Sequence, residues 1–426
     1  MKPTKLLAAM LLAGVALGAH AQAGKDNLAA LKQFKVSGTD LNIPPVPQEG
    51  RNAEAIKANL KNIKMPPGFK IELYAVVPDA RHMAVAPNTN MLFVGTRKTR
   101  VWAVTDRNGD GTADEVKQFA PSLNFKVPNG VCWTKDGFLI VVEHNRVLNF
   151  PAAEFFYEGP DVAVIEVVPQ GGLIPVEEES FNHGARVCRV ADDGTLYVAL
   201  GQPYNVQPAG KVDLYDKLGI GGIVRMNAFD GSKREVYSRG VRNSVGMDIN
   251  PKDKTVWWTD NQTDGLGDDV PPGELNRSTK LGEHFGYPYW NGKFKVAGTA
   301  AAPDLKDMKP PANAVFPQVE FPAHQAQLGM TFYNGKQFPA KYQGGVFVAS
   351  HGSWNRTKAT GALINFVPIK ADGTAGAAEV FAEGWLDANG IYKGRPVDVA
   401  PMKDGSLLIS DDYVGAIYRV TYSAPN

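Results

Sequence analysis

A polar turn runs into a short apolar burst in Asp192-Asp193-Gly194-Thr195-Leu196-Tyr197-Val198-Ala199-Leu200-Gly201. Asp and Gly followed by β-branched and aromatic residues are typical of a turn that enters a β-strand. The pattern recurs at residues 91–95, 138–143, 255–260, 346–350 and 406–412. Most of the intervals lie near the length of one four-stranded propeller blade. The six bursts therefore predict an all-β chain folded as a six-bladed β-propeller.

The two terminal parts of this repeat region supply strands that close the ring. Residues 68–74 alternate apolar and polar side chains, the pattern of a strand with one buried face. Residues 415–420 form another strand-like stretch. We expect residues 68–74 to be the outside strand that completes the last blade. The long segment between the fourth and fifth bursts is then expected to form functional loops on one face of the ring.

The composition excludes some classes of partner. The 426 residues include 44 Gly and 30 Pro, which suits many turns better than many helices. The formal net charge is +1 and no basic stripe is present, so nucleic acid is not an expected partner.

The N-terminus predicts export. Lys2 and Lys5 precede an apolar run over residues 6–17, and Ala19-His20-Ala21 is a small-x-small cleavage site. We expect a signal peptide at residues 1–21, an extended leader at 22–65 and a propeller catalytic domain at 66–426. No other apolar run reaches the length of a membrane span. The mature protein is therefore expected to be soluble and secreted, and periplasmic in a Gram-negative host.

Cys132 and Cys188 are the two cysteines of the chain. Both lie in apolar segments ahead of Asp-Gly turns, in what we interpret as successive blades. An oxidising compartment permits a disulfide between them, and two inert buried thiols are the alternative. The chain has no Cys-x-x-Cys-His motif, so no covalent haem is expected.

Two short motifs favour turns over ligand sites. Residues 106–111 begin like an EF-hand loop, but the twelfth position is Lys117 and no flanking helices are predicted. A tight hairpin turn is the preferred interpretation, with a weakly held calcium ion as the alternative. The glycines of residues 219–222 lack the spacing and the helix of a dinucleotide fold.

Three loop segments carry residues suited to chemistry. His183 precedes a strand, and a loop histidine at a propeller mouth can accept a proton near neutral pH. Arg242 and Asn243 lie between glycines and can bind anionic oxygens. Residues 260–269 contain four carboxylates and several amide or hydroxyl oxygens, which are the ligands that Ca²⁺ requires. Each segment also has an ordinary structural interpretation: a packing histidine, a salt bridge and a solvated acidic loop.

Together these segments resemble the glucose/sorbosone dehydrogenase family of soluble pyrroloquinoline-quinone-dependent sugar dehydrogenases, nearest to its sorbosone-dehydrogenase-like branch. Six stretches carry the resemblance in family order and span roughly residues 68–422: residues 182–201, 240–243, 268–277, 282–288, 351–356 and 394–399. The family is a six-bladed propeller, which agrees with the six bursts.

The resemblance implies roles for the loop residues. His183 is similar to the general base that takes the proton of the sugar hydroxyl while hydride passes to the quinone. Arg242 would neutralise the charge that develops on the quinone oxygens, with Asn243 hydrogen-bonding beside it. Arg395 is similar to an arginine that holds the quinone carboxylates. His351 or Arg356 would replace a lysine that family members place against the quinone.

The family also implies a substrate contact and a metal. Asn129 stands where glucose-oxidising members have a glutamine near the sugar. Ca²⁺ would bridge quinone oxygens to a loop, here assigned to Asp264, Gly265 and Leu266, and would act as a Lewis acid.

The sequence thus predicts an oxidoreductase that uses pyrroloquinoline quinone and Ca²⁺ to oxidise a sugar hydroxyl of the aldose or sorbosone type. A separate acceptor, such as a periplasmic cytochrome c or a quinone, would take the electrons. Two alternatives come from other classes. One is a calcium-dependent propeller lactonase or other hydrolase, and the other is a non-catalytic propeller that binds a glycan or a protein.

Overall fold

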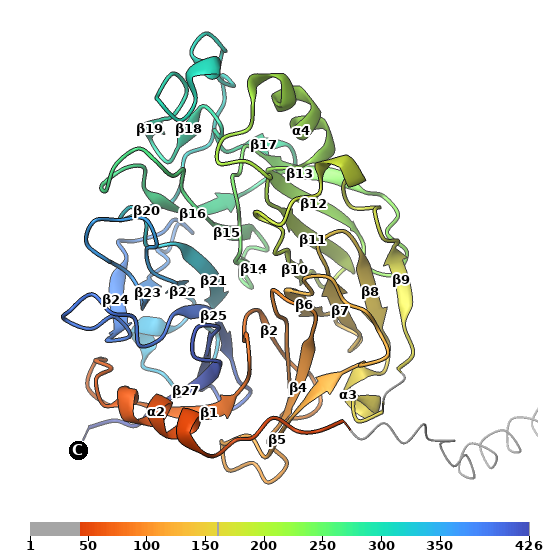
Figure 1. Ribbon diagram of the computed structural model, residues 1–426, viewed down its shortest axis with the longest axis vertical. Helices are drawn as coiled ribbons and strands as arrows, with labels where there is room; N and C mark the ends of the chain where they lie inside the picture. The colour runs from red at the N-terminus through yellow and green to blue at the C-terminus, as the bar shows by residue number, and fades with distance from the viewer. Residues whose placement is uncertain (1–42, 160–161, 426) are drawn as a thin grey trace, which may run out of the picture. The chain divides into compact units, whose positions relative to one another are not determined.

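Six β-sheets surround a central axis in the computed structural model, which describes residues 43–159 and 162–425 (Figure 1). Each of these sheets contains the four antiparallel strands of a blade, and one sheet gains a fifth strand at its edge. The described residues therefore form the six-bladed β-propeller that the sequence predicts. The predicted signal peptide, residues 1–21, lies outside the described residues.

The first three blades follow one another along the chain. Blade 1 consists of β2 (Met83–Val85), β3 (Leu92–Val94), β4 (Val101–Thr105) and β5 (Glu115–Phe119). Blade 2 consists of β6 (Gly130–Trp133), β7 (Leu139–Val142), β8 (Val147–Phe150) and β9 (Ile165–Val168). Blade 3 consists of β10 (Val187–Val190), β11 (Thr195–Leu200), β12 (Gly222–Asn227) and β13 (Glu235–Arg239), with β17 (Glu283–His284) parallel to β13.

The last three blades include one long insertion. Blade 4 consists of β14 (Met247–Ile249), β15 (Val256–Asp260), β16 (Gly273–Ser278) and β20 (Val319–Phe321). Blade 5 consists of β21 (Gln327–Phe332), β22 (Val346–Ser350), β23 (Leu363–Val367) and β24 (Glu379–Glu383). Blade 6 consists of β25 (Pro396–Pro401), β26 (Leu407–Asp411), β27 (Ala416–Tyr422) and β1 (Phe69–Val76). The insertion between β16 and β20 carries β17 and the short hairpin β18 (Trp290–Asn291) and β19 (Phe294–Lys295).

The six sequence bursts occupy the same place in every blade. They form the second strands β3, β7, β11, β15, β22 and β26. The first strands β2, β6, β10, β14, β21 and β25 lie next to one another in that order and return to β2. Apolar clusters fill the space between neighbouring blades, and burial of this surface stabilises the ring.

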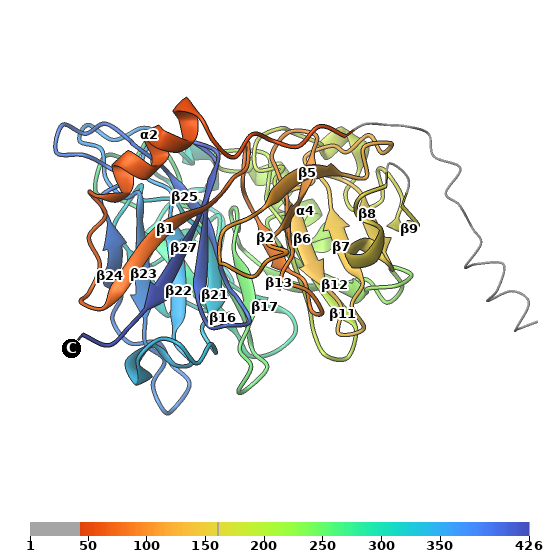
Figure 2. The same ribbon diagram turned by 90° about the horizontal axis from the view of Figure 1, so that it is seen from below.

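Strand β1 closes the ring as expected. It pairs antiparallel with β27, and Phe69 lies opposite Tyr422 (Figure 2). The first described strand thus completes the last blade, and hydrogen bonds between distant parts of the sequence hold the circle together. The predicted hairpin turn at residues 106–111 is also confirmed, since it connects β4 to β5.

The leader predicted for residues 22–65 is described only from residue 43 onward, and the expected extended conformation is wrong for residues 51–60. Residues Arg51–Leu60 form helix α2, and Ala53 and Ile56 pack into the apolar cluster of blades 5 and 6. Its apolar stripe is only three turns long, so tertiary packing rather than sequence periodicity stabilises this helix. The other helical segments are α3 (Ala153–Phe156), α4 (Val212–Leu218) and the 3₁₀ turns η1 (Val176–Glu178), η2 (Ala209–Lys211), η3 (Pro303–Leu305) and η4 (Ala340–Tyr342). None of the helices in the described ranges has the length and apolar character to cross a bilayer.

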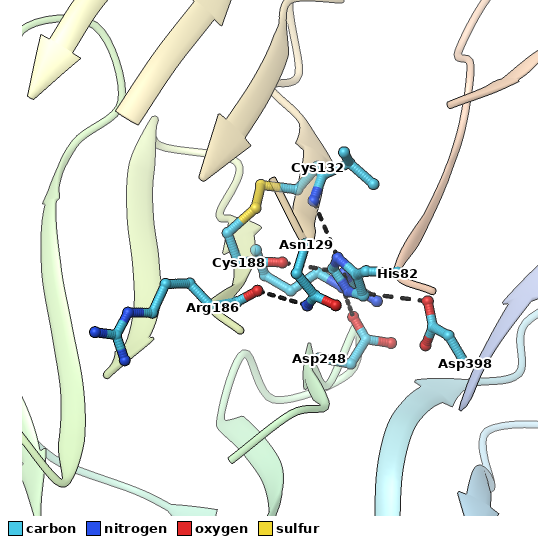
Figure 3. Close-up of a disulfide and its surroundings, with 9 residues drawn as sticks. His82, Asn129, Cys132, Arg186, Cys188, Asp248 and Asp398 are labelled. Carbon is cyan, nitrogen blue, oxygen red and sulfur yellow. Dashed lines mark hydrogen bonds and ion pairs between the residues drawn. A yellow bond between two sulfur atoms is a disulfide. The ribbon is translucent and has the colours of Figure 1, made fainter. Parts of the chain in front are cut away.

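Cys132 and Cys188 form a disulfide, which settles the alternative left open by the sequence. The bond joins β6 to β10, the first strands of blades 2 and 3 (Figure 3). Asn129 and Arg186 lie on the same two segments just before these strands, and the Asn129 side chain donates to the Arg186 carbonyl at 2.7 Å. The disulfide therefore fixes the seam between blades that leads to the loops described next.

Candidate active site

A cavity of about 230 Å³, the main pocket, gathers the polar loops of several blades. Its charged and titratable lining residues are Arg81, Arg97, Arg242, His183, His324, His351 and Asp264. They either precede the first strand of a blade or follow its first two strands, as His183 precedes β10 and His351 follows β22. Because these two strands are antiparallel, both positions lie at the same end of the ring. This topology explains how distant segments converge on one site.

His183 is fixed in one orientation. Its Nδ1 lies 2.5 Å from the carbonyl oxygen of Gln202 and donates to it, so Nε2 carries the lone pair. The residue has φ of 55°, a left-handed conformation that is rare outside glycine, and Arg186 holds its carbonyl at 3.0 Å. Burial, and then the charge of Arg242, lower the pKa of His183 to about 3. The ring is therefore neutral at physiological pH, with Nε2 free of partners among the described residues.

Arg242 and Asn243 are held through their backbone. The buried carboxylate of Asp260 accepts the amide of Arg242 at 2.8 Å and that of Asn243 at 2.6 Å. The Arg242 guanidinium donates to both the carbonyl and the side-chain oxygen of Asn205 at 2.9 Å and lies 3.3 Å from Asp264. These contacts hold the buried guanidinium of Arg242, which lines the main pocket, in a single orientation.

Asp260 lies next to a second buried carboxylate. It is the cross-strand partner of Glu274, and both side chains are fully buried. Burial, together with the neighbouring Glu274, raises the pKa of Asp260 above its usual range. Asn291 connects this pair to the site, since it donates to Glu274 at 2.6 Å and accepts the amide of Thr263 at 2.7 Å. The buried side chains of Asp260 and Glu274 therefore anchor the loop that follows β15.

His351 belongs to a second network on the wall of the main pocket. Its Nε2 lies 2.8 Å from Asp412 Oδ1, and the other oxygen of Asp412 forms an ion pair with the buried Arg81. Burial opposes ionisation of Asp412, but Arg81 and the His351 hydrogen bond outweigh it and hold the pKa of this carboxyl below its usual range. Asp412 is thus a carboxylate that orients one arginine and one histidine toward the same cavity.

Asp264 is the carboxylate in the lining of the main pocket. Its Oδ1 accepts the amide of Asn355 at 2.7 Å, and its side chain is 29% exposed. Gln262 also lines the pocket, and its Oε1 is buried without a partner among the described residues. Gly265 faces a neighbouring cavity, and Leu266 lines neither that cavity nor the main pocket. Of the three predicted metal residues, the structure therefore brings only Asp264 to the main pocket.

Three other predicted residues lie behind or beside the main pocket. Asn129 is buried and accepts from Arg81 Nε at 2.8 Å, so it positions an arginine instead of facing the cavity. Arg395 donates to the carbonyl of His351 at 3.0 Å and lies over the ring of Tyr392. Arg356 donates to the carbonyl of Asp268 at 3.0 Å. The structure does bring His183, Arg242, Asn243 and His351 together in the lining.

Sequence reasoning did not single out several residues of the pocket. They are Arg81 and Arg97, with Asp412 behind them, while Gln262, Trp354 and Asn355 lie within predicted segments but were given no role of their own. A positional signal was available for some: Arg81 precedes the first strand of blade 1 as His183 precedes that of blade 3. Asp412 carried the same kind of signal, since it follows β26, the second strand of blade 6, as His351 follows β22.

Comparison with known proteins identifies a family and two relatives of this chain. It matches the TrAA12-like family over residues 63–423. An uncharacterized protein of Borreliella burgdorferi is 31% identical over 380 residues, which cover 87% of this chain and 93% of that protein. The aldose sugar dehydrogenase YliI of Escherichia coli is 31% identical over 169 residues, 37% of this chain and 42% of that protein.

Solved structures share the fold at low sequence identity. A Trichoderma reesei carbohydrate-active enzyme of family AA12, solved with iodide, has a TM-score of 0.69 at 19% identity and covers 85% of this chain and 98% of its own. The holo pyranose dehydrogenase PQQ domain of Coprinopsis cinerea has a TM-score of 0.66 at 17% identity, with 89% and 99% covered.

Proposed function

This chain belongs to the TrAA12-like family, and on that premise we propose that it is an exported sugar dehydrogenase that uses pyrroloquinoline quinone and Ca²⁺. The substrate is a sugar hydroxyl of the aldose or sorbosone type, and the electrons pass to a separate acceptor such as a periplasmic cytochrome c or a quinone. The names of an aldose sugar dehydrogenase relative and of a pyranose dehydrogenase PQQ domain with the same fold support this proposal.

The charge of the main pocket is the observation that carries the proposal. Three arginines line it against one carboxylate, Asp264. Pyrroloquinoline quinone is a planar molecule with several carboxylates, and guanidinium groups bind carboxylates through parallel hydrogen bonds. The residues present therefore fit the cofactor. Arg81, Arg97 and Arg242 would hold it, and the oxygens of Asp264 and Gln262 would hold Ca²⁺.

Bound in this pocket, the quinone and its Ca²⁺ supply a hydride acceptor and a Lewis acid. His183 performs the proton transfer. Its Nδ1–H is held by Gln202, so Nε2 can take the proton of the sugar hydroxyl as the hydride leaves carbon. Arg242 is the second cause of the low pKa of His183. An anion that pairs with Arg242 offsets this cause and raises the pKa of His183 toward the range of an effective base.

Arg242 and the His351 network orient the reacting groups. Asp260 and Asn205 fix Arg242, so its charge does not have to reorganise when negative charge develops. Asp412 keeps His351 Nε2 as a donor, which leaves Nδ1 as the acceptor nitrogen of this pocket-lining histidine. A lactonase would need several carboxylates around a metal, and the described lining contains one.

Reconstitution of activity tests the proposal. Purified protein would receive pyrroloquinoline quinone and Ca²⁺ and then a panel of aldoses with an artificial electron acceptor. We expect sugar-dependent reduction of the acceptor that requires both additions. Hydrolysis of a lactone panel, with no reduction by any sugar, would overturn the proposal and favour the hydrolase.

A further inference from the structure

A second cavity of about 350 Å³, the side pocket, adjoins the main pocket. The two cavities share a wall formed by Asp264, His324, Trp354 and Asn355. On the far side of this wall, the side pocket is completed by Asn205, Gly265, Gly267 and Asp268. A ligand bound in the main pocket therefore lies next to the side pocket, and Trp354 lines both cavities.

Trp354 is unusually exposed for its size. Its relative exposure is 76%, whereas Trp102, Trp257, Trp258 and Trp385 are buried. An indole in water forgoes the burial that makes aromatic residues favourable in cores, and rings of this kind at a cavity edge are typical of binding sites. The indole therefore offers an apolar face to whatever enters the side pocket.

Two glycines of the side-pocket lining, Gly265 and Gly267, expose backbone without a side chain. Gly265 and Gly267 have φ of 85° and 104°, and no atom lies within 4 Å of the position that a Cβ would take at either residue. Arg356 and Thr357 hold this loop in place through hydrogen bonds to Asp268 at 3.0 and 3.1 Å. The side pocket is thus open, and its loop is held in one conformation. Arg356, predicted to bind the cofactor, supports this loop and does not line the main pocket.

The charge of the side pocket disfavours an anionic ligand. Its described lining contains Asp264 and Asp268 but no lysine or arginine. The carboxylates of Asp264 and Asp268 can accept hydrogen bonds from the hydroxyl groups of a neutral ligand, whereas the side chains of Asn205, Asn355 and His324 already make hydrogen bonds within the protein. A sugar ring has an apolar C–H face for Trp354 and a rim of hydroxyls for these carboxylates.

We propose that the side pocket is a subsite for a second sugar ring, so that the substrate class is a disaccharide or a longer oligosaccharide. The ring that reacts lies in the main pocket near His183, and the next ring stacks on Trp354. This inference rests on the proposed function for the identity of the first ring, but the binding of the second ring can be measured separately.

Fluorescence of the cofactor-free protein tests the subsite directly. Acrylamide quenches the exposed indole of Trp354 before the buried ones. We expect maltose or cellobiose to protect this fluorescence at concentrations where glucose does not, and Trp354→Phe to remove the protected signal. If neither disaccharide protects it better than glucose, the subsite does not exist.

Kinetics of the reconstituted protein give a second test. We expect Trp354→Ala to lower the ratio of kcat/KM for the disaccharide to kcat/KM for its monosaccharide by about tenfold, mainly through KM. Trp354→Phe should restore most of this ratio. Phe155→Ala, which removes a 67% exposed ring on α3, is the matched control and should leave the ratio unchanged. An equal loss for both sugars in Trp354→Ala would contradict the proposal.

The two tests separate failure of the subsite from failure of the proposed function. Protection by a disaccharide in a protein that does not bind the quinone would leave the subsite standing without the dehydrogenase. Oxidation of monosaccharides with no selectivity change in Trp354→Ala would leave the dehydrogenase without the subsite.

Discussion

The main pocket and the side pocket share one wall but differ in charge. The main pocket is lined by three arginines and one carboxylate, whereas the described lining of the side pocket has two carboxylates and no basic residue except His324. Asp264 and Trp354 face both. Under the two proposals, the main pocket would bind an anionic cofactor and the reacting sugar ring, and the side pocket would bind the next ring of a neutral sugar chain.

The support behind the two pockets differs in the same way. Buried groups with short hydrogen bonds hold the main pocket, as Asp260 holds Arg242 and Asp412 holds Arg81. Loop-to-loop bonds from Arg356 and Asn355 hold the side pocket at the surface. A preorganised charged site costs little reorganisation during a reaction, whereas a surface subsite can accept varied sugars.

Replacement of His183 is expected to give the largest effect. His183→Ala removes the group that takes the hydroxyl proton, so kcat should fall by about 10²–10⁴-fold. The Kd of the quinone should change little, because the arginines remain. Stopped-flow reduction by sugar and a binding titration measure the two quantities. Retention of the wild-type kcat would show that the main pocket does not use this base.

Replacement of Arg242 should separate the two pockets. Arg242→Gln removes a buried, oriented cation, and we expect the Kd of pyrroloquinoline quinone to rise by about 10–100-fold. Arg356→Gln is the matched control, because this arginine supports the side pocket; its quinone Kd should stay within about twofold of wild type. If both variants weaken quinone binding equally, the division by charge is wrong.

The protonation of His183 should respond to the cofactor. Burial and Arg242 lower the pKa of His183 to about 3, so the folded protein keeps a neutral ring where the unfolded chain, below about pH 6.5, takes up a proton. The contribution of His183 to the free energy of unfolding is therefore lost as the pH falls from about 6.5 toward about 3. NMR titration of the ring should show its pKa rising by about one unit or more when the quinone pairs with Arg242. An unchanged pKa would argue against that pairing.

Replacement of Asn129 should have the smallest effect on catalysis. Its amide lies behind the main pocket, between Arg81 and the carbonyl of Arg186. Asn129→Ala should lower the free energy of unfolding by about 1–3 kcal/mol, because buried partners lose their hydrogen bonds. Chemical denaturation measures this loss, and the sugar KM should stay near wild type. A large rise in KM with unchanged stability would restore Asn129 as a substrate contact.

Local sequence patterns predicted the ring well. Each burst became the second strand of a blade, because a short apolar run bounded by Gly and Asp turns specifies a buried strand without help from distant residues. His183 and Arg242 reached the main pocket because each precedes a first strand, a position that the topology places at one end of the ring.

Contacts between distant segments were not predictable in the same way. Arg81 and Asp412 are 331 residues apart and meet only because β1 pairs with β27 and closes the ring. Helix α2 has too short an apolar stripe to be recognised before its packing surface is known. Asn129 and Arg395 were assigned from the family resemblance, but which way such side chains point depends on their neighbours.

The most direct test of the account is an absorbance titration of cofactor-free protein with pyrroloquinoline quinone, with and without Ca²⁺. We expect binding of the quinone to saturate at one equivalent, and its affinity to fall when a chelator removes Ca²⁺. A titration that does not saturate at any Ca²⁺ concentration would contradict a main pocket built for an anionic quinone.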